Sequence, residues 1–310
     1  MVTTIEDVHA DVLACALRRL DGRSLAAASC ATAGLRALAA DPDTWRALCL
    51  AEWPSLAALP SQPHQHGLLL SADLPPRRLF ADASPFPCPD AAAANAAGEL
   101  RLPKNLVSAV DVYYRGAPLL SRVVETPGCS SPWFLGAPFR VEALDCKKPA
   151  PLAAAFSPAE LELSWLVVDP ARGRAVNVSS RTAVAVGRHW YTGEMLVRFA
   201  VVLGGCNFET TVACSEEAGH ISEINLAVEN ADGAAMSGEG TLRLLAAAME
   251  GERRGGDGER EEMKARYEAF VRSKKGRKQS KARREALVDL CCSAASAVAV
   301  LAFIATVVLR

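Results

Sequence analysis

The sequence lacks the motifs that usually carry catalysis or hold a metal ion. It has no C-x-x-C pair, no glycine-rich phosphate loop, no G-x-S-x-G nucleophile turn and no H-E-x-x-H metal site. Its five histidines are scattered, and His64 and His66 lie in a proline-rich stretch with no Cys or Glu at ligand spacing. Asp111 and Asp169 form no obvious acid–base pair. The sequence therefore predicts a binding protein without catalytic residues, cofactor or metal.

The chain also has almost no net charge, and its first residues predict no secretory leader. The formal charge is -1 over 310 residues, so bulk charge predicts no nucleic-acid partner. The start of the chain, Met1 to Asp11, has neither the basic nor the apolar region of a signal peptide. Most of the ten cysteines stand alone in apolar runs, which predicts buried thiols in a reducing compartment; examples are Cys15, Cys30, Cys49 and Cys206.

Residues 1–53 show helical periodicity. Apolar residues recur at helical spacing from Val12 to Leu20, and Asp21-Gly22 marks a turn. Ser24 is expected to cap a second helix that reaches Leu38. Asp41 and Pro42 are typical of a third helix start, and Pro54 ends that helix. A unit of this size is close to the lower limit for an independent core, so we expect it to bury apolar surface on a partner.

The middle of the chain changes character twice. Residues 54–103 hold nine of the eighteen prolines and an alanine tract at 91–97, which predicts a connector with little regular structure. A short piece around Arg78–Phe80 is expected to dock. Residues 104–250 carry short β-branched runs between turn signals at 169–174 and 229–233. Seven to nine strands without intervening helices predict an antiparallel, sandwich-like domain, closed by a helix over Thr241–Glu250.

The C-terminal region is first charged and then apolar. Residues 251–286 are expected to form a charged, helical linker, and residues 287–310 a membrane anchor. Leu290 to Leu309 holds twenty residues without a charge, and a bilayer core of about 30 Å needs about 20 such residues. Seven of the eleven residues from Lys274 to Arg284 are basic, which favours a cytosolic side for the rest of the chain.

Alternatives remain open for this tail. A buried core helix has the same length, and the basic cluster is also typical of a nuclear import signal, in which case the protein is cytoplasmic or nuclear. Cys291 and Cys292 are either acylated at the membrane edge or are two small apolar residues of the span.

The helical unit resembles an F-box. Asp21, Ser24 and Leu25 match the turn of that motif, although His9 stands where its opening proline is usual. Residues 162–180, 187–203 and 224–251 resemble the C-terminal region of a plant-specific group of F-box proteins, and the strand pattern there is similar to a phloem-lectin-like sandwich. The resemblance implies that the helical unit binds a Skp-type adaptor through the matching residues Val8, Asp11, Val12, Leu13, Leu17, Leu20, Leu25, Leu38, Trp45 and Leu48.

The resemblance also implies a function. An F-box protein of this kind is the non-catalytic substrate receptor of a Skp–cullin–F-box ubiquitin ligase, and here it is expected to be tethered to the cytosolic face of a membrane through Leu290–Leu309. The predicted fold is α+β: a helical F-box, a Pro/Ala-rich connector, a mainly antiparallel β domain and a single transmembrane helix. The alternative function is a membrane-tethered, lectin-like or other ligand-binding protein with no role in a ubiquitin ligase.

Overall fold

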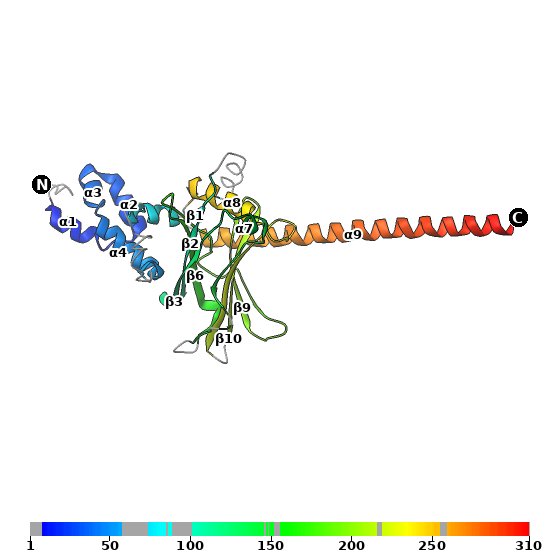
Figure 1. The fold of residues 1–310 in the computed structure, drawn as a ribbon. Helices are drawn as coiled ribbons and strands as arrows, with labels where there is room; N and C mark the ends of the chain where they lie inside the picture. Colours follow the sequence, from blue (N-terminus) through cyan, green and yellow to red (C-terminus); the bar gives the residue numbers. More distant parts are fainter. Residues whose placement is uncertain are drawn as a thin grey trace.

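The described part of the chain contains a helical unit, a β domain and one long projecting helix (Figure 1). The fold comes from a computed structural model. This arrangement confirms the predicted α+β fold with its antiparallel sheets and its apolar C-terminal helix. The alanine tract at 91–97, His64 and His66 lie outside the described residues. Those are 8–57, 74–84, 86–88, 101–145, 147, 149–151, 156–215, 219–254 and 259–309.

The helical unit has four helices, not the three that were predicted. The expected single helix over residues 24–38 is wrong, because Thr32 adopts an extended backbone (φ -141°, ψ 160°) and its hydroxyl accepts a hydrogen bond from the Leu35 amide. The expected cap is also displaced, since the Asp21 carboxylate accepts the Ser24 amide at 2.9 Å. The helices are α1 (Ala10–Leu17), α2 (Gly22–Ala31), α3 (Ala33–Leu38) and α4 (Pro42–Glu52).

The connector folds back onto the body where it is described. It contains a 3-10 turn, η2 (Pro54–Ala57), the helix α5 (Pro76–Ala83) and the short strand β1 (Phe86–Pro87). The predicted docking of Arg78–Phe80 is confirmed, because Leu79 is fully buried in α5. The connector thus holds the helical unit and the β domain together instead of only separating them.

The β domain contains two antiparallel sheets. In the first, the spatial order is β3-β2-β6-β7; in the second it is β4-β11-β10-β9-β8, with β5 paired to β11. The turns predicted at 169–174 and 229–233 are confirmed. The first sheet is built from β2 (Leu106–Tyr114), β3 (Ala117–Thr126), β6 (Leu161–Asp169) and β7 (Arg174–Asn177). The second is built from β4 (Arg140–Leu144), β5 (Ala150–Pro151), β8 (Ala185–Arg188), β9 (Met195–Leu203), β10 (Cys206–Ser215) and β11 (His220–Glu229).

Short helices close the β domain. The predicted helix over Thr241–Glu250 begins three residues earlier, because the Ser237 hydroxyl accepts the Gly240 amide and caps it. Gly238 lies so close to Phe134 that an added Cβ would meet its carbonyl oxygen at 2.1 Å. These elements are α7 (Pro132–Gly136), η4 (Pro158–Glu160), α8 (Gly238–Glu250) and β12 (Arg253–Arg254), which pairs with β1.

Strands β2 and β6 are buried on both faces. Val110 and Trp165 point into the core between the sheets, whereas Ala109 and Leu166 point to the opposite face, where α4, η2 and α5 cover them. Because a strand alternates its side chains, burial on both faces requires a nearly continuous apolar run, as the sequences LVSAVDVYY and LELSWLVVD show. The helical unit is therefore a covering layer of the first sheet.

Two of the four cysteines that were predicted to be buried are exposed. Cys49 and Cys206 are buried as expected, but Cys15 and Cys30 lie on the outer faces of α1 and α2. Burial raises the pKa of the Cys49 thiol to about 12, so this group stays protonated and acts as a small apolar side chain.

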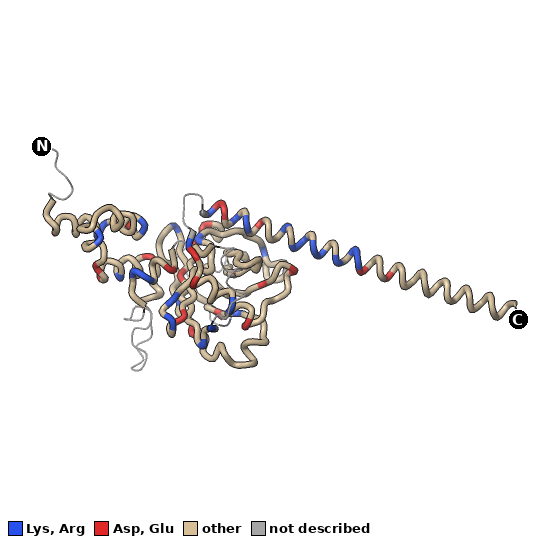
Figure 2. Tube along the Cα trace, turned by 90° about the horizontal axis from the view of Figure 1, so that it is seen from above, with Lys and Arg blue, Asp and Glu red and all other residues tan. Residues whose placement is uncertain are grey.

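The last helix, α9 (Glu259–Val308), starts against the β domain and then leaves it (Figure 1). Phe270 is buried where α9 crosses the sheet that contains β9. Charged residues mark the part of α9 near the body, and the stretch from Leu290 to the end of the helix carries none (Figure 2). By length and composition, α9 is the one helix among the described residues that could cross a membrane, and none of its apolar stretch is buried.

Candidate functional site

Helix α1 presents two different faces. Leu17 is buried against the rest of the helical unit, and Leu13 is partly buried. On the other face, Val12 is 59% exposed and Val8, just before the helix, is 36% exposed. Both valines therefore present apolar surface to solvent at the start of the helical unit.

The ten residues that were predicted to bind an adaptor separate into three groups. The outer group faces solvent, the inner group is buried in the core of the helical unit, and the remaining residues are half-buried around that core. Exposed are Val8, Asp11 and Val12; half-buried are Leu13, Leu20, Leu38 and Leu48; buried are Leu17, Leu25 and Trp45. The resemblance alone did not make this separation, because one motif contains both kinds of residue.

Phe80 contacts both Trp45, within α4, and Trp53, the residue that follows α4. The ring centroid of Phe80 lies 5.4 Å from that of Trp45 and 5.6 Å from that of Trp53, and both ring pairs are tilted. Position 22 is a glycine that lies directly against Phe80. A Cβ added there would stand 2.1 Å from the phenyl ring, so a larger residue would displace Phe80. Trp45 therefore belongs to the helical core, whereas Trp53 belongs to the surface that covers the first sheet.

A buried carboxylate connects the end of α4 to the β domain. Asp111 on β2 is fully buried and accepts hydrogen bonds from the Ser55 amide at 2.8 Å, the Ser55 hydroxyl, and the Ser121 hydroxyl at 2.6 Å. Burial is the main cause that raises the pKa of Asp111, and the hydroxyl donors oppose it. Ser55 is thereby fixed to the middle of the sheet.

Replacing Asp111 with alanine is expected to destabilise the protein by about 1–3 kcal/mol, because the Ser55 amide is left buried without an acceptor. Asp111→Asn is expected to be tolerated, since its amide oxygen can still accept from Ser55. The raised pKa means that Asp111 favours folding below the ordinary Asp pKa, and that this contribution is lost as the pH rises through the raised value. The stability of Asp111→Asn relative to wild type should therefore increase with pH, as measured by urea denaturation. An equal loss for both variants would contradict the role as an acceptor.

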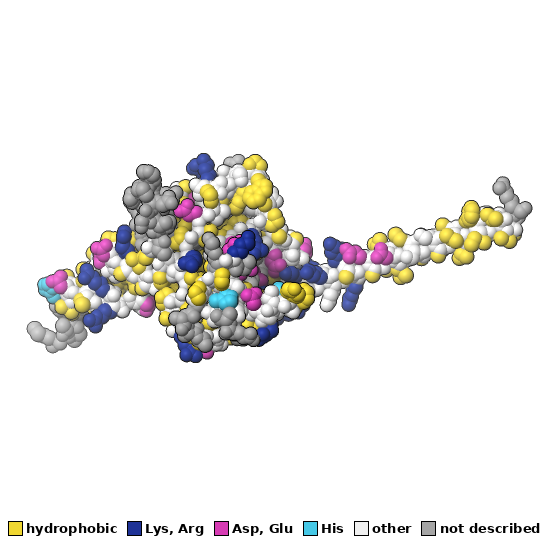
Figure 3. Space-filling model, turned by 60° about the horizontal axis from the view of Figure 1, so that its bottom comes forward, with side chains coloured by type: hydrophobic (Ala, Val, Ile, Leu, Met, Phe, Trp, Pro, Cys, Tyr) yellow, Lys and Arg dark blue, Asp and Glu magenta, His cyan; other side chains and the backbone are white. Residues whose placement is uncertain are grey.

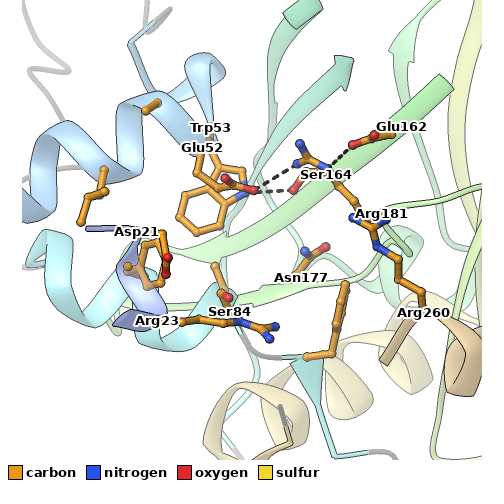
Figure 4. A pocket seen from close by; sticks show the side chains of 16 residues that line it. Asp21, Arg23, Glu52, Trp53, Ser84, Glu162, Ser164, Asn177, Arg181 and Arg260 are labelled. Carbon is orange, nitrogen blue, oxygen red and sulfur yellow. Dashed lines mark hydrogen bonds and ion pairs between the residues drawn. The ribbon is translucent and has the colours of Figure 1, made fainter. Parts of the chain in front are cut away.

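A cleft of about 540 Å³ opens between the helical unit and the β domain (Figure 4). Trp53 forms part of its wall and donates from its indole nitrogen to the Ser164 hydroxyl at 3.0 Å. Arg181 bridges Glu52 and Glu162 at 3.1 and 2.8 Å, so its charge is already paired. The described lining contains no nucleophile with an adjacent base.

The turn between β8 and β9 exposes two large aromatic side chains. Trp190 is 90% exposed and Tyr191 is 79% exposed. His189, at the start of this turn, accepts a local hydrogen bond from the Thr192 amide at 3.1 Å. The exposed aromatics were not singled out from the sequence, although a Trp-Tyr pair followed by Thr-Gly is typical of a turn at the tip of a hairpin. Within the described residues, no group of three or more His, Cys, Asp or Glu is placed to hold a metal.

Comparison with curated proteins decides the family. The chain is 33% identical to "Probable F-box protein At2g36090" of Arabidopsis thaliana over 305 residues, which cover 93% of this chain and 90% of that protein. It is 32% identical to "F-box protein At2g27310" of the same plant, over 93% of this chain and 92% of that protein. The chain belongs to the F-box protein family. No protein-family model matches it, and no solved structure matches it.

A shorter match involves a third F-box protein. "F-box protein GID2" of Oryza sativa subsp. japonica is 42% identical over 52 residues, which is 17% of this chain and 24% of that protein. The long matches to the Arabidopsis proteins, in contrast, include most of the chain. The F-box protein described here therefore shares its β domain, as well as a short motif, with relatives of similar length.

Proposed function

We propose that this F-box protein is the substrate receptor of a Skp–cullin–F-box ubiquitin ligase and performs no bond chemistry itself. The observation that carries the proposal is the outward surface of Val8 and Val12 in a family member whose motif core is buried as a folded unit. In this proposal the outward residues contact a Skp-type adaptor. Leu17, Leu25 and Trp45 shape the helical unit and act on the adaptor only through it.

The position of the two ends supports a membrane-tethered receptor. The helical unit and the C-terminus lie at opposite ends of the molecule, with the β domain between them (Figure 1). If the apolar part of α9 spans a bilayer, the adaptor surface points away from that bilayer and stays accessible. In the proposed topology residues 1–284 face the cytosol, and the β domain recruits the protein substrate.

Replacing Val8 and Val12 together with aspartate is expected to weaken adaptor binding by about tenfold or more, because apolar residues at an interface core each contribute about 1 kcal/mol or more. The folded state should be unchanged, since both side chains already face solvent. Binding is measured by titrating the full chain, in detergent, with a purified Skp-type adaptor. Thermal melting of the same samples checks the fold.

Val186→Asp is the matched control for this double variant. Val186 is 42% exposed on β8, in the β domain. Its replacement should leave the affinity for the adaptor unchanged. Deletion of residues 1–53 is a poorer test, because it removes Cys49 and Trp53 from the cover of the first sheet. Equal affinity for the wild type and the double variant would contradict the proposed surface.

The exposed aromatic turn supports a second candidate function. Trp190 and Tyr191 form an exposed aromatic pair with ring centroids 5.6 Å apart, and exposed aromatic patches commonly mark binding surfaces. On this reading the protein is a membrane-tethered ligand-binding module with no ligase role. A wild-type chain that is folded but does not bind any Skp-type adaptor would favour this function over the first.

A further inference from the structure

Helix α9 runs without interruption through three different surroundings. Its first part lies on the β domain, where the Tyr267 hydroxyl contacts Glu209 at 3.3 Å and Phe270 is buried. Lys274 then pairs with Glu229, and Arg277 pairs with Asp232 at 3.3 Å. Beyond Arg277 no ion pair connects α9 to the described part of the body. The helix is therefore held at its base and free from residue 278 onward.

The seven basic residues from Lys274 to Arg284 thus have different roles. Lys274 and Arg277 neutralise carboxylates of the β domain, as described above, and Lys275 between them is exposed. The later residues are exposed and have no such partner among the residues that the structure describes. They are Lys278, Lys281, Arg283 and Arg284. A basic cluster that served only to dock the helix would not extend past its last contact with the body.

The free basic residues stand close to the apolar run. At about 1.5 Å per residue, Arg284 precedes Leu290 by about 9 Å and Lys281 precedes it by about 14 Å. The polar headgroup layer on each side of a bilayer is about 5–8 Å deep, and the screening length is about 8 Å at physiological salt. If Leu290 marks the edge of the hydrocarbon, both charges fall within reach of the headgroups.

Acidic residues in the same stretch reduce this charge without cancelling it. Glu285 and Asp289 lie between Arg284 and the apolar run. Four basic and two acidic side chains leave a net charge of +2 between residues 278 and 289. The space-filling view shows basic side chains on α9 beside the body and hydrophobic side chains along its distal part (Figure 3). This net positive charge therefore lies in one short stretch of α9, just before the apolar run begins.

We propose that residues 278–284 of α9 form a binding surface for anionic phospholipid headgroups of the cytosolic leaflet. This inference rests on the proposed membrane anchoring. The surface is charge-complementary to the headgroups and continuous with the apolar span. A nucleic acid carries phosphates too, but the near-neutral net charge of the whole chain and the position beside the apolar run favour lipid.

Lipid contact is measured on the full chain. The protein is reconstituted in phosphatidylcholine vesicles that contain trace spin-labelled phosphatidylserine or spin-labelled phosphatidylcholine. Electron paramagnetic resonance reports the fraction of each label that the protein immobilises. The association constant for phosphatidylserine should exceed that for phosphatidylcholine by about fivefold or more. Each basic residue near an anionic surface contributes about 1 kcal/mol, which corresponds to about fivefold in the association constant.

Two paired variants locate the effect. Lys281→Ser with Arg284→Ser should bring the constant for phosphatidylserine close to that for phosphatidylcholine. Lys264→Ser with Arg272→Ser removes the same number of charges, but Arg272 stands about 27 Å before Leu290, so the preference should be retained.

The possible outcomes separate the two proposals. Equal immobilisation of both labels by the wild type would overturn the headgroup surface but leave the membrane anchor in place. Loss of the preference in both paired variants would show that the total charge matters and would overturn the assignment to residues 278–284. The absence of an immobilised fraction for either label would overturn the anchor, and the headgroup surface with it. None of these results bears on adaptor binding.

Discussion

Replacing Trp45 with alanine is expected to lower the free energy of unfolding by about 3–5 kcal/mol, as for other large-to-small changes in a packed core. Trp45 is 2% exposed, and its indole nitrogen donates to the Ala39 carbonyl at 2.7 Å. The substitution leaves a cavity beside Phe80 and removes the partner of the Ala39 carbonyl. Urea denaturation of the full chain in detergent, followed by circular dichroism, measures the loss.

Trp190→Ala is the control for this prediction. Trp190 is also a tryptophan but is 90% exposed, so its removal should change stability by about 0.5 kcal/mol or less. A Trp45→Ala protein as stable as Trp190→Ala would mean that Trp45 is not part of a packed core. Reduced adaptor affinity in Trp45→Ala is expected only to the extent that the helical unit unfolds.

Replacing Trp53 with alanine is expected to cause a loss of similar size, about 3–5 kcal/mol, by a different route. Trp53 is buried between Phe80 and the first sheet, and it donates to Ser164 on β6. The substitution removes the contact through which the helical unit covers the sheet. Hydrogen exchange should accelerate in α4 and α5 and remain slow in β10 and β11, because local opening follows the loss of local contacts.

Trp53→Phe distinguishes the contribution of the ring's apolar contact from that of its hydrogen bond. Phenylalanine keeps most of the apolar contact with Phe80 but cannot donate to Ser164, so the loss should be about 1 kcal/mol. Uniformly faster exchange in both sheets of the Trp53→Ala protein would contradict a local role. Unchanged exchange in α4 would show that Trp53 does not hold the helical unit in place.

Local signals in the sequence predicted the elements well where a single residue decides the geometry. Asp41 and Pro42 start α4, and Pro54 ends it, as expected from their backbone chemistry. Thr32 was missed because a threonine between two alanines is compatible with a helix interior as well as with a cap. The outcome depended on tertiary packing around Leu35, which no local pattern contains.

The candidate site was predicted less completely than the fold. The motif residues were identified through a resemblance, but helical periodicity was not used to separate outward Val12 from inward Leu17. The role of Asp111 could not be predicted, since its donor Ser55 is 56 residues away in sequence. Trp53 packs against Phe80 of the connector and also donates to Ser164 on β6, and this second contact could not be predicted because it depends on the whole sheet.

Because α9 is one unbroken helix, the number of residues between the β domain and the apolar stretch determines which way the β domain faces. An α-helix turns by about 100° and advances by about 1.5 Å for each residue. One residue added between Arg277 and Leu290 would rotate the β domain about the axis of α9, relative to the apolar stretch, by about that angle. Seven added residues would restore nearly the original facing and move the body about 10 Å further from the apolar stretch. The length of α9 thus sets both the facing of the β domain and its distance from the apolar stretch, in steps of one residue.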